Sequence, residues 1–233
     1  GRSSCRKPNL QNQPRREGVR DCYIPRKGYV YAACDYHVAE LCSLAQILLN
    51  KYEHSAMAEA IQEGRELHLE TAAGILGLSY DEVLTRHKTG DKKVKEARQL
   101  AKAANFGFPG GLGADSFVAF AKASYGLEIE RDDAYSLKRT WLQRYPEMQR
   151  YFSDIATRCE KGGGRFTYTQ PVSGRLRGDV GFCDGCNSGF QGLTADGAKQ
   201  ALHEVIRECY VDCGTPLFGC RPVAFIHDEI LLA

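Results

Sequence analysis

Acidic residues interrupt an apolar run near the C-terminal end of this sequence. In "VAFIHDEILLA", His227, Asp228 and Glu229 lie between β-branched and aliphatic residues. The apolar flanks, 223–226 and 230–232, predict two short buried strands joined by a two-residue turn at His227 and Asp228. Turns favour Asp in any case, so the run has two interpretations. It is either an ordinary hairpin or a hairpin that directs a carboxylate towards a metal ion.

A second carboxylate lies near the start of the chain, in "GYVYAACDYHVAEL". Residues 30–34 alternate as a strand does, and the apolar residues from 38 to 48 repeat at helical spacing. Asp35 and Tyr36 therefore lie at a strand-to-helix junction. If both strands belong to one sheet, Asp35 and Asp228 can meet at its edge. Such a pair suits Mg²⁺, and two of these ions could activate an attacking hydroxyl and stabilise a leaving pyrophosphate.

A long basic helix is predicted over residues 91–108, with Pro109 ending it. Arg98, Lys102 and Phe106 follow one another at intervals of four residues and so share a face. The two cations in line could hold a triphosphate, and the ring could stack on a base or pack against a sugar. The spacing equally allows a solvated cationic stripe with one core phenylalanine.

Composition is typical of a soluble globular protein: 233 residues, of which 43% are hydrophobic and 26% charged. This length allows one large domain or two small ones. We find no apolar run that could span a membrane, and the polar start is no signal peptide. Since the chain begins in a polar loop and stops in an apolar strand, we expect a fragment of a longer protein.

Positive charge is clustered although the net charge is only +2. Eight Lys or Arg residues lie within 2–27, and seven lie within 86–102. Clusters of this kind are what a phosphate-binding surface needs, although each one could also be a solvated face.

Ten cysteines raise the question of disulfides or zinc. Cys183 and Cys186, with Cys209 and Cys213, have loosely metal-like spacing, but part of that stretch is predicted to be helical. We favour reduced thiols in a cytosolic protein, with zinc as the alternative.

The elements expected along the chain predict an α+β fold. Strands lie near both ends, so a small antiparallel sheet would carry both termini and a mainly helical insertion would lie between them. A hairpin is expected through Gln170 and Pro171, and a strong helix is expected after the glycine-rich stretch 178–189. Helices are expected at 64–78, 79–87, 91–108, 114–125, 131–160 with a break near Pro146, and 191–211.

Six segments, in order, resemble motifs of the A-family DNA polymerases of the bacterial polymerase I type. Three of them, "DYHVAEL", "RQLAKAANFG" and "HDE", are similar to the family's polymerase motifs. The others are "GRSSCRKPNLQNQPRR", "LHLETAAGILG" and "CNSGFQGLTADGAK". The resemblance implies a right-hand polymerase architecture lacking the thumb. Residues 1–45 would be the first part of the palm, 46–180 the fingers and 181–233 the second part of the palm.

The resemblance also implies a metal site. Asp35 and Asp228 would be the catalytic, metal-binding aspartates, with the backbone carbonyl of Tyr36 as a further ligand. Two Mg²⁺ ions would bind there, and Mn²⁺ could substitute. Glu229 would lie near the site without necessarily binding a metal ion.

For the incoming deoxynucleoside triphosphate, the resemblance implies five contacts. Glu40 would be the steric gate that rejects a 2′-hydroxyl. Arg98, Lys102 and His68 would bind the phosphates, and Phe106 would pack against the sugar. Primer and template would be contacted by Arg2, Asn9, Gln11, Asn12, Asn187, Gln191 and His227.

The implied function is a DNA-templated DNA polymerase core that extends a primer 3′-OH and releases pyrophosphate. Its partners would be primer–template DNA and deoxynucleoside triphosphates, without a membrane. It would be a cytoplasmic monomer of a bacterial cell or a phage-infected host, with thumb and exonuclease domains in the longer protein. The alternatives are a single-subunit RNA polymerase-like enzyme and a catalytically inactive nucleic-acid-binding fragment.

Two residues depart from the family's pattern. Gly110 stands where the family usually has Tyr, and Cys183 stands where an Arg is often found. These departures would change template handling, fidelity and one contact with the duplex. Both departures favour a phage-like branch.

Overall fold

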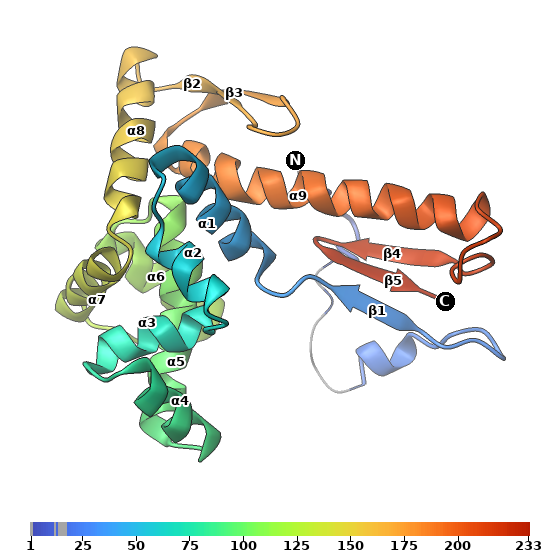
Figure 1. Cartoon of the computed structure of the whole chain (residues 1–233), viewed down its shortest axis with the longest axis horizontal. Coiled ribbons are helices and arrows are strands. Elements are labelled where there is room, and N and C mark those ends of the chain that lie inside the picture. The colour runs from blue at the N-terminus through green and yellow to red at the C-terminus, as the bar shows by residue number, and fades with distance from the viewer. Residues whose placement is uncertain (1, 12, 14–17) are drawn as a thin grey trace. The chain divides into compact units, whose positions relative to one another are not determined.

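The chain has an α+β fold, as predicted (Figure 1). A computed structural model describes residues 2–11, 13 and 18–233. The strands are β1 (Ala32–Asp35), β2 (Phe166–Thr169), β3 (Leu176–Val180), β4 (Pro222–Ile226) and β5 (Glu229–Leu232). The helices are α1 (Ala39–Tyr52), α2 (Ala56–Gln62), α3 (Leu67–Leu76), α4 (Tyr80–Lys88), α5 (Lys92–Gly107), α6 (Ala114–Tyr125), α7 (Arg131–Arg144), α8 (Glu147–Lys161) and α9 (Phe182–Tyr210). Short 3₁₀ turns span Arg20–Cys22 and Phe108–Gly110.

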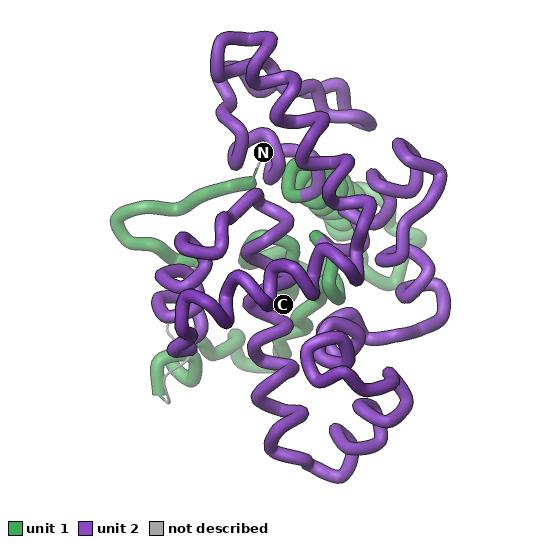
Figure 2. The backbone as a smooth tube through the Cα atoms, turned by 90° about the vertical axis from the view of Figure 1, so that its left-hand side faces the viewer, with its two compact units in different colours: residues 1–40, 191–233 green, residues 41–190 purple. Residues whose placement is uncertain are grey.

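Two compact units divide the chain (Figure 2). Unit 1 consists of residues 1–40 and 191–233, so it contains both ends of the sequence. Unit 2 is the continuous stretch 41–190.

Unit 1 contains a three-stranded antiparallel sheet of order β1-β5-β4. The two-residue turn predicted at His227 and Asp228 joins β4 to β5. The prediction of two buried strands is correct only in part. Ile230 and Leu232 of β5 are buried beside Cys209 of α9, whereas Val223 of β4 is 49% exposed. An antiparallel sheet that packs on one face only leaves the alternate side chains to the solvent.

Unit 2 is mainly helical, and its helices begin and end where local signals predict. Ser79 caps α4 by accepting a hydrogen bond from the backbone N–H of Glu82, and Gly77 ends α3 with a left-handed φ of 64°. Pro146 separates α7 from α8, as expected. One cluster joins α3, α4 and α5 through Leu69, Ala72, Ala73, Val83, Val94, Ala97 and Ala101.

The helix predicted to begin at residue 191 begins earlier, at Phe182, so α9 includes most of the preceding glycine-rich stretch. Glycines serve close packing here. A Cβ on Gly185 would lie 2.9 Å from the ring of Phe166, and one on Gly189 would lie 2.7 Å from the hydroxyl of Tyr151. Tertiary contact therefore overrides the weak helix propensity of glycine. The β2–β3 hairpin, by contrast, forms where it was predicted.

Among the described residues, no helix is long and apolar enough to cross a bilayer. All ten cysteines are free thiols. Burial raises the pKa of the Cys186 thiol to about 12.

Candidate active site

Three acidic residues lie at one end of the sheet in unit 1. Asp35 is the last residue of β1 and pairs with Glu229, the first residue of β5. Asp228 precedes Glu229 in the turn, and Figure 1 shows β1, β5 and β4 side by side. Cα atoms of paired antiparallel residues lie about 4.5–5.5 Å apart. The sheet thus brings two distant acidic segments of the sequence to the same place.

The donor set at this sheet end fits a hard divalent cation. Asp35 is exposed, whereas Asp228 and Glu229 are partly buried. Within the described part of the chain, no three His, Cys, Asp or Glu side chains are arranged to hold a metal by themselves. Two aspartates and the carbonyl of Tyr36 would leave positions for water or phosphate oxygens, which Mg²⁺ usually retains.

The predicted gate residue, Glu40, is held by two groups of its own unit. It is buried near the start of α1, forms an ion pair with Arg2, and accepts a hydrogen bond of 3.3 Å from Gln191 Nε2. Burial lowers the pKa of the Arg2 guanidinium, and the negative charge of Asp228 opposes that shift. Arg2 thereby couples the predicted gate to a predicted metal-binding carboxylate.

Other predicted primer and template residues have structural contacts. Gln11 Nε2 donates to Ser3 Oγ at 2.9 Å and to the carbonyl of Phe225 at 3.2 Å, which fastens the N-terminal segment to β4. Asn9 Oδ1 accepts a hydrogen bond from the backbone of Gln11 at 3.2 Å. Asn12 lies outside the described residues.

Predicted nucleotide-binding residues gather in unit 2. Arg98, Lys102 and Phe106 share one partly buried face of α5. The ring of His68, on α3, lies 5.6 Å from the ring of Phe106 between centroids. Arg98 Nε donates to Glu66 Oε2 at 2.9 Å. Arg98, Lys102 and Phe106 therefore form a single surface, and the buried ring of His68 on α3 packs against the Phe106 edge of it.

Sequence reasoning missed Glu66 and Asn105, which support that surface. Glu66 caps α3 by accepting hydrogen bonds from the backbone N–H groups of His68 and Leu69, and it also binds Arg98. Asn105 is only 1% exposed and lies four residues after Ala101 on the buried side of α5. A polar residue in an apolar helical stripe could have signalled a buried hydrogen-bond network.

Comparison with known proteins decides the family. The family model described as DNA polymerase family A matches residues 1–233. The chain belongs to DNA polymerase family A.

Curated relatives of this family-A chain are DNA polymerase I proteins of bacteria. That of Aquifex aeolicus is 27% identical over 234 residues, which cover 100% of this chain and 37% of the relative. That of Lactococcus lactis subsp. lactis is 30% identical over 250 residues, covering 100% of this chain and 25% of the relative. The chain thus spans about a quarter to two fifths of the length of these relatives.

A solved structure of this family has the same fold. The POL domain of Pol1 from M. smegmatis, in complex with DNA primer-template and dNTP, is 25% identical with a TM-score of 0.74. The match covers 100% of this chain and 39% of that chain. The family resemblance and the α+β prediction are both confirmed.

The two departures from the family-A pattern meet in one contact within unit 2. A Cβ on Gly110 would lie 2.8 Å from the side-chain amide of Asn187. That amide donates to the carbonyl of Cys183 at 2.9 Å, and Cys183 Sγ lies 3.8 Å from the carbonyl of Gly111. The absence of a side chain at Gly110 therefore makes room for Asn187.

Proposed function

We propose that this chain is the catalytic core of a DNA-templated DNA polymerase, which extends a primer 3′-OH with deoxynucleoside triphosphates and releases pyrophosphate. The observation that carries the proposal is the placement of Asp35 and Asp228 at the same end of one sheet in a family-A chain. Phosphoryl transfer depends mainly on positioning and charge neutralisation, so a few carboxylates and cations suffice.

The metal-binding role belongs to Asp35 and Asp228, together with the carbonyl of Tyr36. Two Mg²⁺ ions, or Mn²⁺ in their place, would supply Lewis acidity at the attacking hydroxyl and the phosphate oxygens. The aspartates hold these ions, and Glu229, opposite Asp35, adds negative potential at the same sheet end. His227 would contact the primer end.

The nucleotide-binding role belongs to α3 and α5. Arg98 and Lys102 neutralise the triphosphate, with His68 as a third contact, while Phe106 packs against the sugar. Arg98 must share its guanidinium between Glu66 and the phosphates, since Glu66 already accepts its Nε–H. Glu40, fixed by Arg2 and Gln191, excludes a 2′-hydroxyl by its bulk.

The remaining assignments follow from the same proposal. The palm would consist of residues 1–45 and 181–233, and the fingers of 46–180. Arg2, Asn9, Gln11, Asn187 and Gln191 would contact primer and template. The polymerase would act as a monomer in the cytoplasm. Support for these partners is that the M. smegmatis neighbour is described with DNA primer-template and dNTP.

Primer extension tests the proposal. This chain should extend a labelled primer with deoxynucleotides in the presence of Mg²⁺, and ribonucleotides should be poor substrates. Asp228→Asn should abolish extension, whereas Asp132→Asn, a change of an exposed carboxylate on α7, should not. Primer–template and nucleotide binding without extension would favour the inactive binding fragment. Preferred use of ribonucleotides would favour the RNA polymerase-like alternative.

A further inference from the structure

Asn105 is the centre of a buried hydrogen-bond network beneath the nucleotide-binding surface of α3 and α5. Its Oδ1 lies 2.8 Å from Trp141 Nε1 and 3.0 Å from Thr71 Oγ1. Its Nδ2 lies 3.2 Å from the carbonyl of Leu67 and 3.1 Å from His68 Nδ1. Both acceptor positions of Oδ1 and both protons of Nδ2 therefore have hydrogen-bond partners, all of them on α3 and α7.

The chemistry of two neighbours fixes the orientation of this amide. The indole N–H of Trp141 can only donate, so the amide atom next to it must be the oxygen. The carbonyl of Leu67 can only accept, so the amide atom next to it must be the nitrogen. Both neighbours require the same orientation of Asn105.

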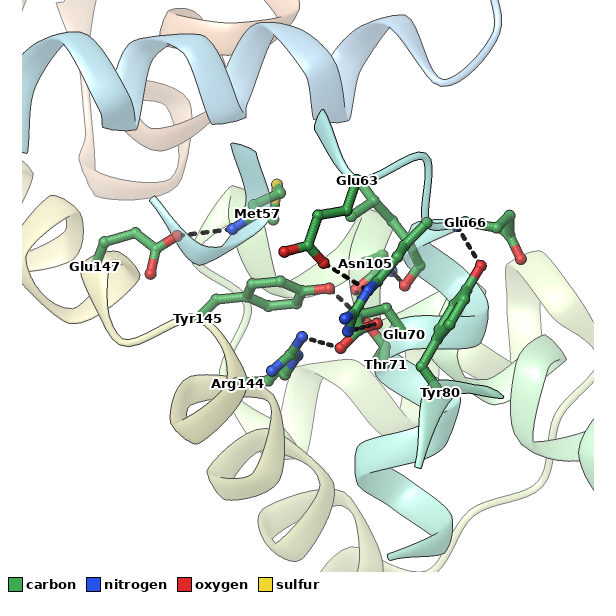
Figure 3. Close-up of polar contacts among 12 residues, drawn as sticks. Met57, Glu63, Glu66, Glu70, Thr71, Tyr80, Asn105, Arg144, Tyr145 and Glu147 are labelled. Carbon is green, nitrogen blue, oxygen red and sulfur yellow. Dashed lines mark hydrogen bonds and ion pairs between the residues drawn. The ribbon is translucent and has the colours of Figure 1, made fainter. Parts of the chain in front are cut away.

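The hydroxyl protons of the network are then fixed as well. Thr71 donates its single proton to Asn105 Oδ1, so the hydroxyl of Tyr145, 3.0 Å from Thr71 Oγ1, must donate to Thr71. Figure 3 shows Asn105, Thr71 and Tyr145 in the interior of unit 2. The Tyr145 hydroxyl is protonated at neutral pH and can donate, and burial raises its pKa further, to about 12.

The remaining proton of the amide determines the state of His68. One Nδ2 proton of Asn105 points to the carbonyl of Leu67, so the other points to His68 Nδ1. A proton on His68 Nδ1 would bring two N–H groups face to face at 3.1 Å. His68 Nδ1 must therefore accept, and the proton of the neutral ring must lie on Nε2.

We propose that Asn105 is a positioning residue that holds His68 as the neutral Nε2–H tautomer, so that His68 donates a hydrogen bond to a phosphate oxygen of the nucleotide. The second half of this inference rests on the proposed function. His68 is 5% exposed, and a hydrogen bond in such a poorly hydrated place is stronger than one in water. The Nε2–H of His68 would thus donate a hydrogen bond of fixed direction to the phosphate, in addition to the positive charges of Arg98 and Lys102.

The test uses ¹⁵N NMR of the His68 ring in this chain, with His68→Gln to assign its signals. Asn105→Asp is nearly isosteric, but its carboxylate can only accept, so His68 Nδ1 should become protonated. Thr71→Val is the matched control, because it removes one hydrogen bond from Asn105 Oδ1 and leaves Nδ2 in place. Binding of inorganic tripolyphosphate with Mg²⁺, measured by calorimetry, gives the second readout.

We expect the Nε2–H pattern in the wild-type chain and in Thr71→Val, and its loss in Asn105→Asp. The affinity for tripolyphosphate should fall about tenfold in Asn105→Asp, which is roughly the effect of losing one hydrogen bond to a charged group. The affinity should fall much less in Thr71→Val. An Nδ1–H pattern in the wild-type chain would overturn the proposal, even if Asn105→Asp did not fold. Equal weakening of tripolyphosphate binding by both variants would also overturn it.

Failure of the proposed function would look different. In that case primer extension would be absent while the tautomer pattern and the tripolyphosphate affinities followed the expectation.

Discussion

The acidic residues at the sheet end of unit 1 and those in the interior of unit 2 have opposite surroundings. In unit 1, Asp35 is exposed and Asp228 only partly buried at the sheet end. In unit 2, Glu70 is 4% exposed, forms an ion pair with Arg144 and lies 3.3 Å from Arg65 (Figure 3). Removing one partner of a buried charge leaves the other uncompensated, which costs stability, whereas an exposed carboxylate contributes little. Substitutions at the sheet end of unit 1 should therefore change activity, and those in the interior of unit 2 should change stability.

The largest effect is expected for Asp35→Asn. If the carboxylate holds a catalytic metal ion, the rate of primer extension should fall about 10³-fold, as it does when a charge-stabilising group is removed. The free energy of unfolding should change by less than about 0.5 kcal/mol, because the side chain is exposed.

The matched variant is Glu229→Gln, which changes the cross-strand partner of Asp35. Its loss of extension rate should be smaller, about tenfold, if it only adds negative potential at the site. If Asp35→Asn were largely unfolded at the temperature of the activity assay, its loss of activity would reflect lost stability. That result would contradict the separation of activity from stability.

The next largest effect is expected for Trp141→Ala in unit 2. Trp141 is fully buried and donates to Asn105, so its truncation should lower the free energy of unfolding by about 4 kcal/mol. Gln143→Ala, on the exposed side of α7, should change it by less than about 0.5 kcal/mol. Urea titrations of both variants provide the measurement, and equal losses would contradict a core role for Trp141.

Tyr145 gives a prediction about alkaline pH. Because its pKa is raised from 10.0 to about 12 in the folded chain, its contribution is fully present below pH 10. It should be lost as pH rises from 10 towards 12, by ~3 kcal/mol in all. Tyr145→Phe should cost about 1 kcal/mol at pH 7, through its hydrogen bond to Thr71, and flatten the alkaline decline. Urea unfolding at pH 8 and pH 11 measures both effects, and an unchanged decline would contradict the assignment.

The smallest effect is expected for Gly110→Ala. The new Cβ would displace the amide of Asn187 from its hydrogen bond to Cys183, at a cost of about 1 kcal/mol. Gly197→Ala, within α9, is the control, since a Cβ there would meet nothing within 4 Å. Adding Asn187→Ala to Gly110→Ala should recover part of the loss in thermal unfolding, and strictly additive losses would contradict the contact.

Local signals in the sequence predicted much of the fold. Ser79 and Gly77 mark helix ends through hydrogen bonds and backbone angles that depend on nearby residues. The turn at His227 and Asp228 follows from the strand pattern on either side. The sequence predicted that Asp35 and Asp228 meet only if both strands share a sheet, and it gave no register for the pairing of Asp35 with Glu229.

What the sequence could not predict depends on contacts between distant residues. The helix was expected only after Gly185 and Gly189, yet both lie within α9, where they let aromatic side chains approach. The role of Asn105 needs Trp141 and Leu67, which lie on other segments. The short α2 has too few residues to show a helical period. The roles of the site residues themselves remain predictions.

The contact between Gly110 and Asn187 also has a consequence for how this part of the chain can be redesigned. A larger side chain at position 110 would need the space that Asn187 now fills. The order of two substitutions therefore matters, because a smaller residue at position 187 has to be present before a larger one fits at position 110. A protein engineer who wants a large side chain at position 110 should change Asn187 first.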